Sequence, residues 1–222
     1  MNAPRWHALI LGVILAAYWS RVIRMVLKQR RRTGRDANFV PPEPLGRAIR
    51  IVWYPVVVAW VAHPVINAYK RRAPVPLEPL VRQDLIAAIG LFIAIAALAG
   101  SWICWKRMGK SWRMGIDPSE STQLIVTGPY AYVRHPIYAL SSLLMIASLL
   151  ALPSPLMLLL AVIHLTFLQW EARREERHLL AVSGDQYAPY CARVGRFLPR
   201  RFSSQARGAT ENTEDTEGGE DG

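Results

Sequence analysis

The chain has 222 residues, of which 52% are hydrophobic, and it carries 27 Lys and Arg against 16 Asp and Glu. So basic a chain could indicate nucleic-acid binding, but its long apolar runs exclude that class and favour a membrane protein with a basic cytoplasmic face. The two cysteines and five scattered histidines form neither a disulfide framework nor a metal-ligand spacing. We therefore expect no metal and no nucleic acid as partners.

Five apolar segments predict an all-α integral membrane protein with about five transmembrane helices: 6–27, 50–69, 85–105, 137–152 and 155–171. A spanning helix needs about 20 mostly apolar residues. The last two segments are shorter, and only Leu152–Pro155 separates them. Prolines end one helix and start the next, so these segments predict a tight C-terminal hairpin that only just crosses the bilayer.

The positions of the basic residues predict the orientation in an inner (cytoplasmic) membrane. With five spans, 20 Lys and Arg fall on one side and 5 on the other. Because cytoplasmic loops carry the excess of Lys and Arg, the N-terminus is expected outside and the C-terminal region in the cytoplasm.

Three regions are expected along the chain. Residues 1–105 hold the first three membrane helices, and residues 106–202 hold a core that ends in cytoplasmic C-terminal helices. Within that core, a helix is expected over 171–183, with Gly184 as its stop. Six of the 16 acidic residues lie in the last twelve positions, and residues 203–222 are expected to be a disordered acidic tail.

Polar and aromatic residues gather where the fourth apolar segment begins. Gly128 and Pro129 indicate a turn, and Pro136 is suited to the first position of a helix. The free N–H groups of a helix start can hold an anion, and Arg134 could grip the same anion with two nitrogens. The alternative is an ordinary basic residue at a membrane boundary. Likewise, Tyr130 and Tyr138 could stack on a planar ligand or serve as interface aromatics.

A second polar group follows the hairpin. Glu175 and Glu176 come directly after Arg173-Arg174, and helical spacing should turn at least one carboxylate inward, where it could hold an ammonium group. The alternative is a charged, solvated helix face. Tyr187, Tyr190, Arg193 and Arg196 recur every three residues, as on one face packed against the core or on a basic surface helix.

Taken in order, these motifs resemble the isoprenylcysteine carboxyl methyltransferase family and related membrane phospholipid methyltransferases. The resemblance rests on GPY-x-x-VRHP-x-Y from Gly128 to Tyr138, then EE-x-x-L from Glu175, then G-x-x-Y-x-x-Y-x-x-x-V from Gly184. It covers about residues 106–200. It implies an integral membrane methyltransferase that uses S-adenosylmethionine, held on the cytoplasmic side.

The resemblance also implies roles for individual residues. The acceptor would be a lipophilic small molecule or a prenylated one that arrives through the membrane lipids. The implied catalytic residues are Glu175, Glu176 and Arg173. The implied cofactor-binding residues are Gly128, Tyr130, Arg134, His135, Pro136, Tyr138, Glu175, Glu176, Tyr187 and Tyr190.

One departure from the family pattern bears on the acceptor. The carboxyl methyltransferases usually have an arginine four residues before the paired glutamates, where this chain has Glu171. A glutamate would repel a substrate carboxylate, although Arg173 or Arg174 could substitute. Carboxyl O-methylation and amine N-methylation therefore both stay open, and an amine would need a base such as Glu175, Glu176 or His135.

Two other functions are compatible with the sequence. A membrane reductase of the steroid-reductase type has a similar C-terminal layout, and it uses NADPH without a Rossmann glycine motif. A non-enzymatic membrane accessory protein is the other alternative. Binding tests with S-adenosylmethionine and NADPH would separate the three.

Overall fold

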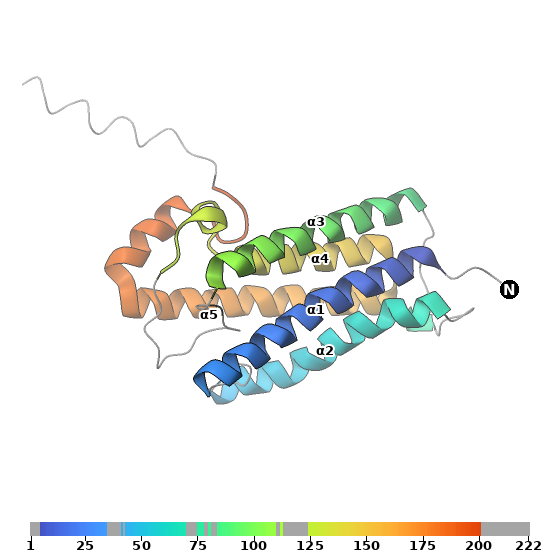
Figure 1. Cartoon of the computed structure of the whole chain (residues 1–222), viewed down its shortest axis with the longest axis horizontal. Coiled ribbons are helices and arrows are strands. Elements are labelled where there is room, and N and C mark those ends of the chain that lie inside the picture. The colour runs from blue at the N-terminus through green and yellow to red at the C-terminus, as the bar shows by residue number, and fades with distance from the viewer. Residues whose placement is uncertain are drawn as a thin grey trace, which may run out of the picture.

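The chain is described by a computed structural model that covers residues 5–34, 41, 43–69, 75–77, 80, 84–109, 112 and 124–200. Within these ranges every regular element is a helix, as Figure 1 shows. The expected acidic tail at 203–222 and most of the segment between α3 and residue 124 lie outside the described residues.

Five long helices make up the described fold: α1 (Trp6–Thr33), α2 (Pro44–Tyr69), α3 (Asp84–Met108), α4 (Pro136–Ala151) and α5 (Pro155–Arg193). Four are long and apolar enough to cross a membrane, whereas α4 has only 16 residues. The predicted all-α integral membrane fold is confirmed. Two short 3-10 helices, η1 (Val75–Leu77) and η3 (Gly128–Ala131), complete the set.

The hairpin between α4 and α5 forms as its prolines predict. Helix α4 ends at Ala151, and Pro155 occupies the first turn of α5. Ser154 caps α5, because its hydroxyl accepts a hydrogen bond from the backbone nitrogen of Met157 at 3.1 Å. A three-residue connection thus makes the two helices antiparallel neighbours.

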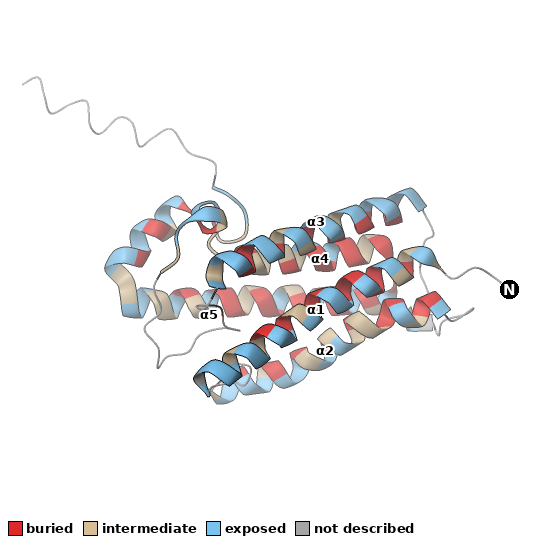
Figure 2. Ribbon diagram, viewed as in Figure 1, coloured by how far each residue is buried: buried red, intermediate tan, exposed pale blue. Residues whose placement is uncertain are grey.

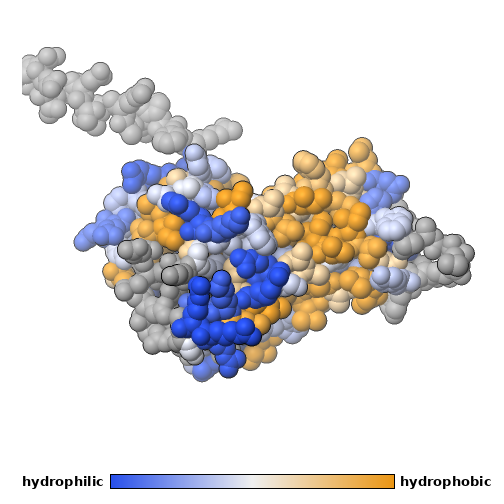
Figure 3. Space-filling view, in the orientation of Figure 1, coloured by the Kyte–Doolittle hydropathy of each residue, from blue (hydrophilic) through white to orange (hydrophobic). Residues whose placement is uncertain are grey.

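Close backbone packing joins α3 to α4. A Cβ atom added to Gly90 would lie 2.7 Å from the nitrogen of Ala151 and 2.8 Å from the oxygen of Ala147. Small residues allow membrane helices to approach in this way. Buried residues line the inside of the bundle, while the outside of its right-hand part is mainly apolar, as expected for contact with lipid (Figures 2 and 3).

Polar side chains also connect helices inside the apolar bundle. The indole nitrogen of Trp53 donates to Nδ1 of His164 at 3.2 Å, and Nε2 of His164 lies 3.1 Å from the hydroxyl of Ser141. Trp60 donates to Ser148 at 3.0 Å. These contacts connect α2 to α4 and α5 at defined positions along the helix axes. The register of the bundle therefore depends on specific hydrogen bonds as well as on packing.

Helix α5 is longer than a membrane span requires. Its part before Ser183, residues 155–182, spans about 42 Å, against about 30 Å for a bilayer core. Its apolar part is residues 155–170, and charged residues follow. The expected stop at Gly184 is replaced by a break at Ser183, where φ is −137° and ψ is 38°, and the helix resumes to Arg193. This last part turns aside toward η3 (Figure 1).

Candidate functional site

The start of α4 is built by the turn that the sequence predicts. Gly128 has a φ of 65°, which a residue with a side chain rarely adopts. It opens η3, after which the chain reaches His135 and begins α4 at Pro136. Helix α4 therefore begins where the proline indicated.

The C-terminal segment folds back against this helix start. The nitrogen of Arg134 donates to the carbonyl oxygen of Gly195 at 2.8 Å, and that of His135 donates to Arg196 at 3.1 Å. Val133 and Gly195 form a parallel β-bridge. A Cβ atom on Gly195 would collide with the carbonyl of Leu198, so this close return requires glycine. Residues about sixty positions apart are thus brought together.

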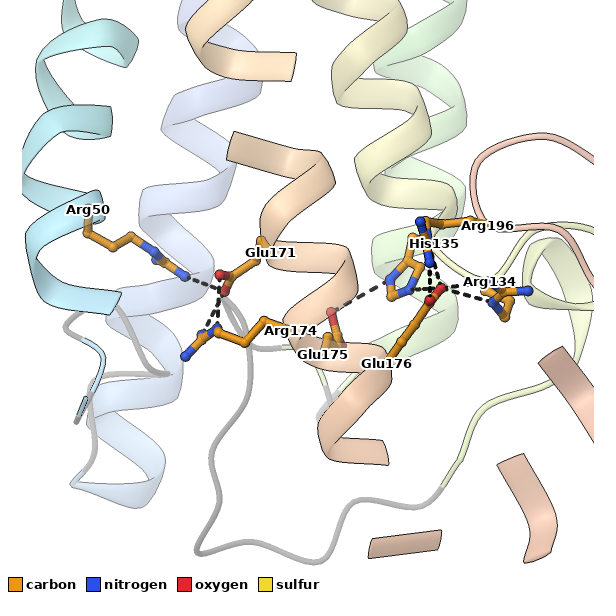
Figure 4. Close-up of polar contacts among 8 residues, drawn as sticks. All are labelled: Arg50, Arg134, His135, Glu171, Arg174, Glu175, Glu176 and Arg196. Atoms are coloured by element: carbon orange, nitrogen blue, oxygen red, sulfur yellow. Dashed lines mark hydrogen bonds and ion pairs between the residues drawn. The ribbon is translucent and has the colours of Figure 1, made fainter. Parts of the chain in front are cut away.

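Glu176 is the centre of a charged cluster at this junction, drawn in Figure 4. Its carboxylate accepts from Nε and Nη2 of Arg134 at 3.0 and 2.8 Å, and from Nε and Nη2 of Arg196 at 2.9 and 2.5 Å. Nε2 of His135 lies 3.2 Å away. One buried carboxylate therefore joins α5, the start of α4 and the returning segment.

Arg134 is fully engaged within the protein. Besides its two bonds to Glu176, its Nη1 donates to the carbonyl oxygens of Cys191, at 3.1 Å, and Val194. All three guanidinium nitrogens are therefore used. Arg134 therefore holds Glu176 and the C-terminal segment together, and its contact with a ligand anion stays a prediction.

The charge of Glu176 is strongly stabilised. Burial alone would raise its pKa, but the hydrogen bonds from His135, Arg196 and Arg134 outweigh burial and hold that pKa well below the usual range. Glu176 therefore stays ionised at every pH at which the protein is expected to work.

Glu175 lies in a different environment from its neighbour. Its side chain is 30% exposed and lies 3.6 Å from Nδ1 of His135. The ring of His135 is stacked on Tyr138 with centroids 5.4 Å apart and planes parallel within 1°. A carboxylate outside the guanidinium cluster thus lies beside a pair of stacked rings.

The other tyrosines named from the sequence gather near the end of α5. The hydroxyl of Tyr190 donates to the carbonyl oxygen of Tyr130 at 2.5 Å, and Tyr187 and Tyr190 pack with Val194 in a small buried core. Burial raises the pKa of the Tyr130 phenol well above its ordinary value, so it stays protonated. Arg173, by contrast, lies on the exposed side of α5.

A second charged cluster lies on the other side of α5 and was missed by the sequence reasoning. Nη2 of Arg50 contacts Glu171 at 3.1 Å, and Arg174 binds the same carboxylate through Nε at 3.2 Å and Nη2 at 2.9 Å. Glu43 contacts Nη1 of Arg174. The sequence does place Arg50 at the very start of an apolar segment, which could have indicated a buried ion pair. It does not indicate the partner, because Glu171 is 121 positions away.

The same part of the chain matches a known family. Residues 85–186 match the phospholipid methyltransferase family. The match runs from α3 through the start of α4 and past Glu176, and it confirms the resemblance drawn from the motifs. The matched range contains Arg134, His135, Glu175 and Glu176, whereas Arg50, Glu43 and Arg196 lie outside it.

One curated relative is a nickel-cobalt-cadmium resistance protein, NccN, of Alcaligenes xylosoxydans xylosoxydans. The two chains are 32% identical over 105 residues, which is 42% of this chain and 44% of the relative. The chain thus aligns with less than half the length of that protein. Among the described residues, no group of three or more His, Cys, Asp or Glu could hold a metal ion.

The low pKa of Glu176 predicts how stability depends on pH. A carboxyl group whose pKa is lower in the folded state stabilises the fold fully above its unfolded pKa, near 4.5, and loses that contribution as the pH falls through the folded pKa. We expect the Glu176 contribution to be constant between pH 8 and about pH 5 and to decline in stronger acid.

Thermal unfolding of the detergent-purified protein between pH 3.5 and 8 measures this dependence, with Glu176→Gln as the control. The difference in unfolding midpoint between the two proteins should shrink only at the acid end. A difference that already shrinks between pH 7 and 6 would contradict the assigned low pKa.

Proposed function

We propose that the protein is an S-adenosylmethionine-dependent membrane methyltransferase acting on a lipid-like or prenylcysteine-like acceptor. The observation that carries the proposal is the family match over residues 85–186, which spans the helix start at Pro136 and the paired glutamates. The contacts among these residues support it, because the family segment and the returning C-terminal segment enclose one charged and aromatic site.

The side chains beside Glu175 fit the chemistry of this cofactor. Its amino acid end carries an ammonium group, for which a carboxylate outside the guanidinium cluster is a suitable partner. Its sulfonium and adenine favour aromatic faces, which His135 and Tyr138 supply. When bound, the cofactor supplies an activated methyl group.

The residues of the site then divide into two sets. Glu175, His135 and Tyr138 would touch the cofactor. Glu176, Arg134 and Arg196 would instead hold the start of α4 and the C-terminal segment in place around it. Methyl transfer needs alignment of the acceptor with the methyl group and exclusion of water, not a covalent intermediate on the protein. An amine acceptor would in addition need a base, a role that we propose for Glu175 or His135.

Calorimetry of the detergent-purified protein with S-adenosylmethionine and with NADPH tests the proposal. We expect S-adenosylmethionine to bind and NADPH not to bind. The reverse result would favour a membrane reductase. Binding of neither would favour a non-enzymatic accessory role, which is the alternative compatible with a relative named as a resistance protein.

We further propose that the end of the bundle holding the charged clusters faces the cytoplasm. The basic last turn of α1, with Arg30, Arg31 and Arg32, lies at that end, and basic loops are retained in the cytoplasm. A C-terminal fusion to a cytoplasm-active reporter should be active, and one to a periplasm-active reporter should be inactive. The opposite pattern would reverse the orientation.

A further inference from the structure

One arginine lies within the membrane-spanning helix α1 and contacts α3. Arg21 precedes Thr33, the last residue of α1, by twelve positions, which is about 18 Å along the helix axis. Its guanidinium carbon lies 4.9 Å from the centroid of the Trp102 ring on α3. Helices α1 and α3 are neighbours in the bundle (Figure 1). Because an ionisable side chain in such a segment is costly, it is usually retained for a function.

The charge of Arg21 has no anionic partner among the residues that the structure describes. Its guanidinium contacts the face of Trp102, but it forms neither an ion pair nor a hydrogen bond with a described residue. Helix α1 contains no Asp or Glu, and the acidic residue of α3, Asp84, lies in the first turn at the opposite end of that helix. Neither of the two helices that surround Arg21 can therefore neutralise it.

The conformation of Arg21 differs from that of an arginine that only reaches toward water. A long basic side chain near a membrane surface can extend so that its charged end stays hydrated. The Nε atom of Arg21 is instead buried, without a hydrogen-bond partner in the described part of the chain, and the guanidinium is held over an aromatic ring. A buried donor without an acceptor is unfavourable. An anion bound from the membrane would supply that acceptor.

A second donor without an acceptor belongs to the same group of side chains. Trp105, one turn beyond Trp102 on α3, is 2% exposed, and its indole nitrogen has no hydrogen-bond partner among the described residues. Its ring centroid lies 6.5 Å from that of Trp102 and 5.0 Å from that of Tyr18, which precedes Arg21 by one turn of α1. Buried indole N–H groups usually have a partner. Two neighbouring helices thus each contribute a buried donor without an acceptor to this group.

We propose that Arg21 binds the phosphate of an anionic phospholipid between α1 and α3, beside Trp102 and Trp105. A phosphate supplies the negative charge that the two helices lack, and its oxygens accept strong hydrogen bonds from a guanidinium group. The lipid is a bound component of the protein and not its methyl acceptor. The inference therefore does not depend on the proposed methyltransferase function, whose residues Glu175 and His135 belong to α5 and the start of α4.

The position of the site along the bundle suits a phospholipid head group. Trp102 precedes Met108, the last residue of α3, by six positions, about 9 Å along the axis. It is 42% exposed, as is typical of the tryptophans that mark a membrane interface. Toward the same end of α1, Arg24 and Lys28 are exposed. Basic sites between membrane helices at this level bind acidic head groups.

Thermal unfolding of the full chain, freed of lipid in an uncharged detergent, tests the proposal without requiring turnover. The probes are dioleoylphosphatidylglycerol, dioleoylphosphatidylcholine and inorganic phosphate. A ligand that binds the folded protein raises the unfolding midpoint. Phosphatidylglycerol should do so at a concentration at least about fivefold lower than phosphatidylcholine, since one basic residue near a membrane surface favours an anionic lipid by roughly that factor. Inorganic phosphate should leave the midpoint unchanged.

Three variants separate a site at Arg21 from the general basic charge of the protein. Arg21→Gln should lose the preference for phosphatidylglycerol, and Arg21→Lys should retain part of it. Without lipid, the unfolding midpoint of Arg21→Gln should equal or exceed that of the parent, because a buried charge without a partner is removed. Arg47→Gln, which removes an exposed arginine from the first turns of α2, is the matched control and should keep the full preference.

Equal effects of the two lipids on the parent protein would overturn the proposal, as would a preference that Arg21→Gln retains. Equal losses of preference in Arg47→Gln and Arg21→Gln would show that net charge attracts the lipid, which contradicts a site at Arg21. Stabilisation by inorganic phosphate to the same extent would identify a free anion as the ligand and reject the phospholipid. A lower lipid-free midpoint in Arg21→Gln would show that the arginine already has a stabilising partner within the chain, and this too would contradict the proposal.

Discussion

Replacement of Glu176 by glutamine is expected to abolish S-adenosylmethionine binding and to destabilise the protein. The carboxylate accepts five contacts, from Arg134, His135 and Arg196. Glutamine keeps the size of the side chain but removes the charge, which leaves buried cations without their partner. Removing one member of a buried ion pair costs about 3–5 kcal/mol.

Two measurements separate the consequences for Glu176→Gln. The thermal unfolding midpoint in detergent should fall, and the dissociation constant for S-adenosylmethionine should rise by about 100-fold or more, equivalent to roughly 3 kcal/mol. Arg196→Gln serves as the comparison, because the Arg196 side chain is 30% exposed and its loss should have a smaller effect. Normal calorimetry with Glu176→Gln would contradict the assignment of this cluster to the cofactor site.

The helical segments could be predicted because hydropathy and proline position are local properties of the chain. Pro136 and Pro155 mark the starts of α4 and α5 in the structure as they do in the sequence. The spacing of Tyr187, Tyr190 and Arg193 allowed a helical face beyond Gly184, and the helix does resume there. Its packing could not be predicted in this way, because it depends on tertiary contacts such as the hydrogen bond of Tyr190 to Tyr130, which no local pattern records.

The different roles of the two adjacent glutamates also depend on tertiary contacts. Glu175 and Glu176 are adjacent in sequence and equally suited to hold an ammonium group. The structure separates them, because the segment from Val194 to Arg196 returns to the start of α4 and places Arg196 against Glu176 only. The pairing of Arg50 with Glu171 could likewise not be predicted from the sequence, because these residues come from different helices.

Replacement of Glu175 by glutamine is expected to weaken S-adenosylmethionine binding without lowering stability. Its carboxylate is 30% exposed, and its ion-pair contact is with His135 at 3.6 Å, beyond the length of a good hydrogen bond. Folding therefore depends little on its charge. A hydrogen bond to a charged group contributes about 1.5–3 kcal/mol, so the dissociation constant should rise by about 10- to 100-fold.

The comparison of the two adjacent glutamates is what decides the roles assigned to them. Calorimetry and thermal unfolding are carried out on Glu175→Gln and Glu176→Gln side by side. If Glu175→Gln weakens binding without changing the unfolding midpoint, Glu175 is the residue that touches the cofactor. If Glu176→Gln weakens binding and also lowers the unfolding midpoint, Glu176 is the residue that holds the surrounding segments in place. If Glu175→Gln binds S-adenosylmethionine as the parent does, the ammonium group is held elsewhere and the role proposed for Glu175 is wrong.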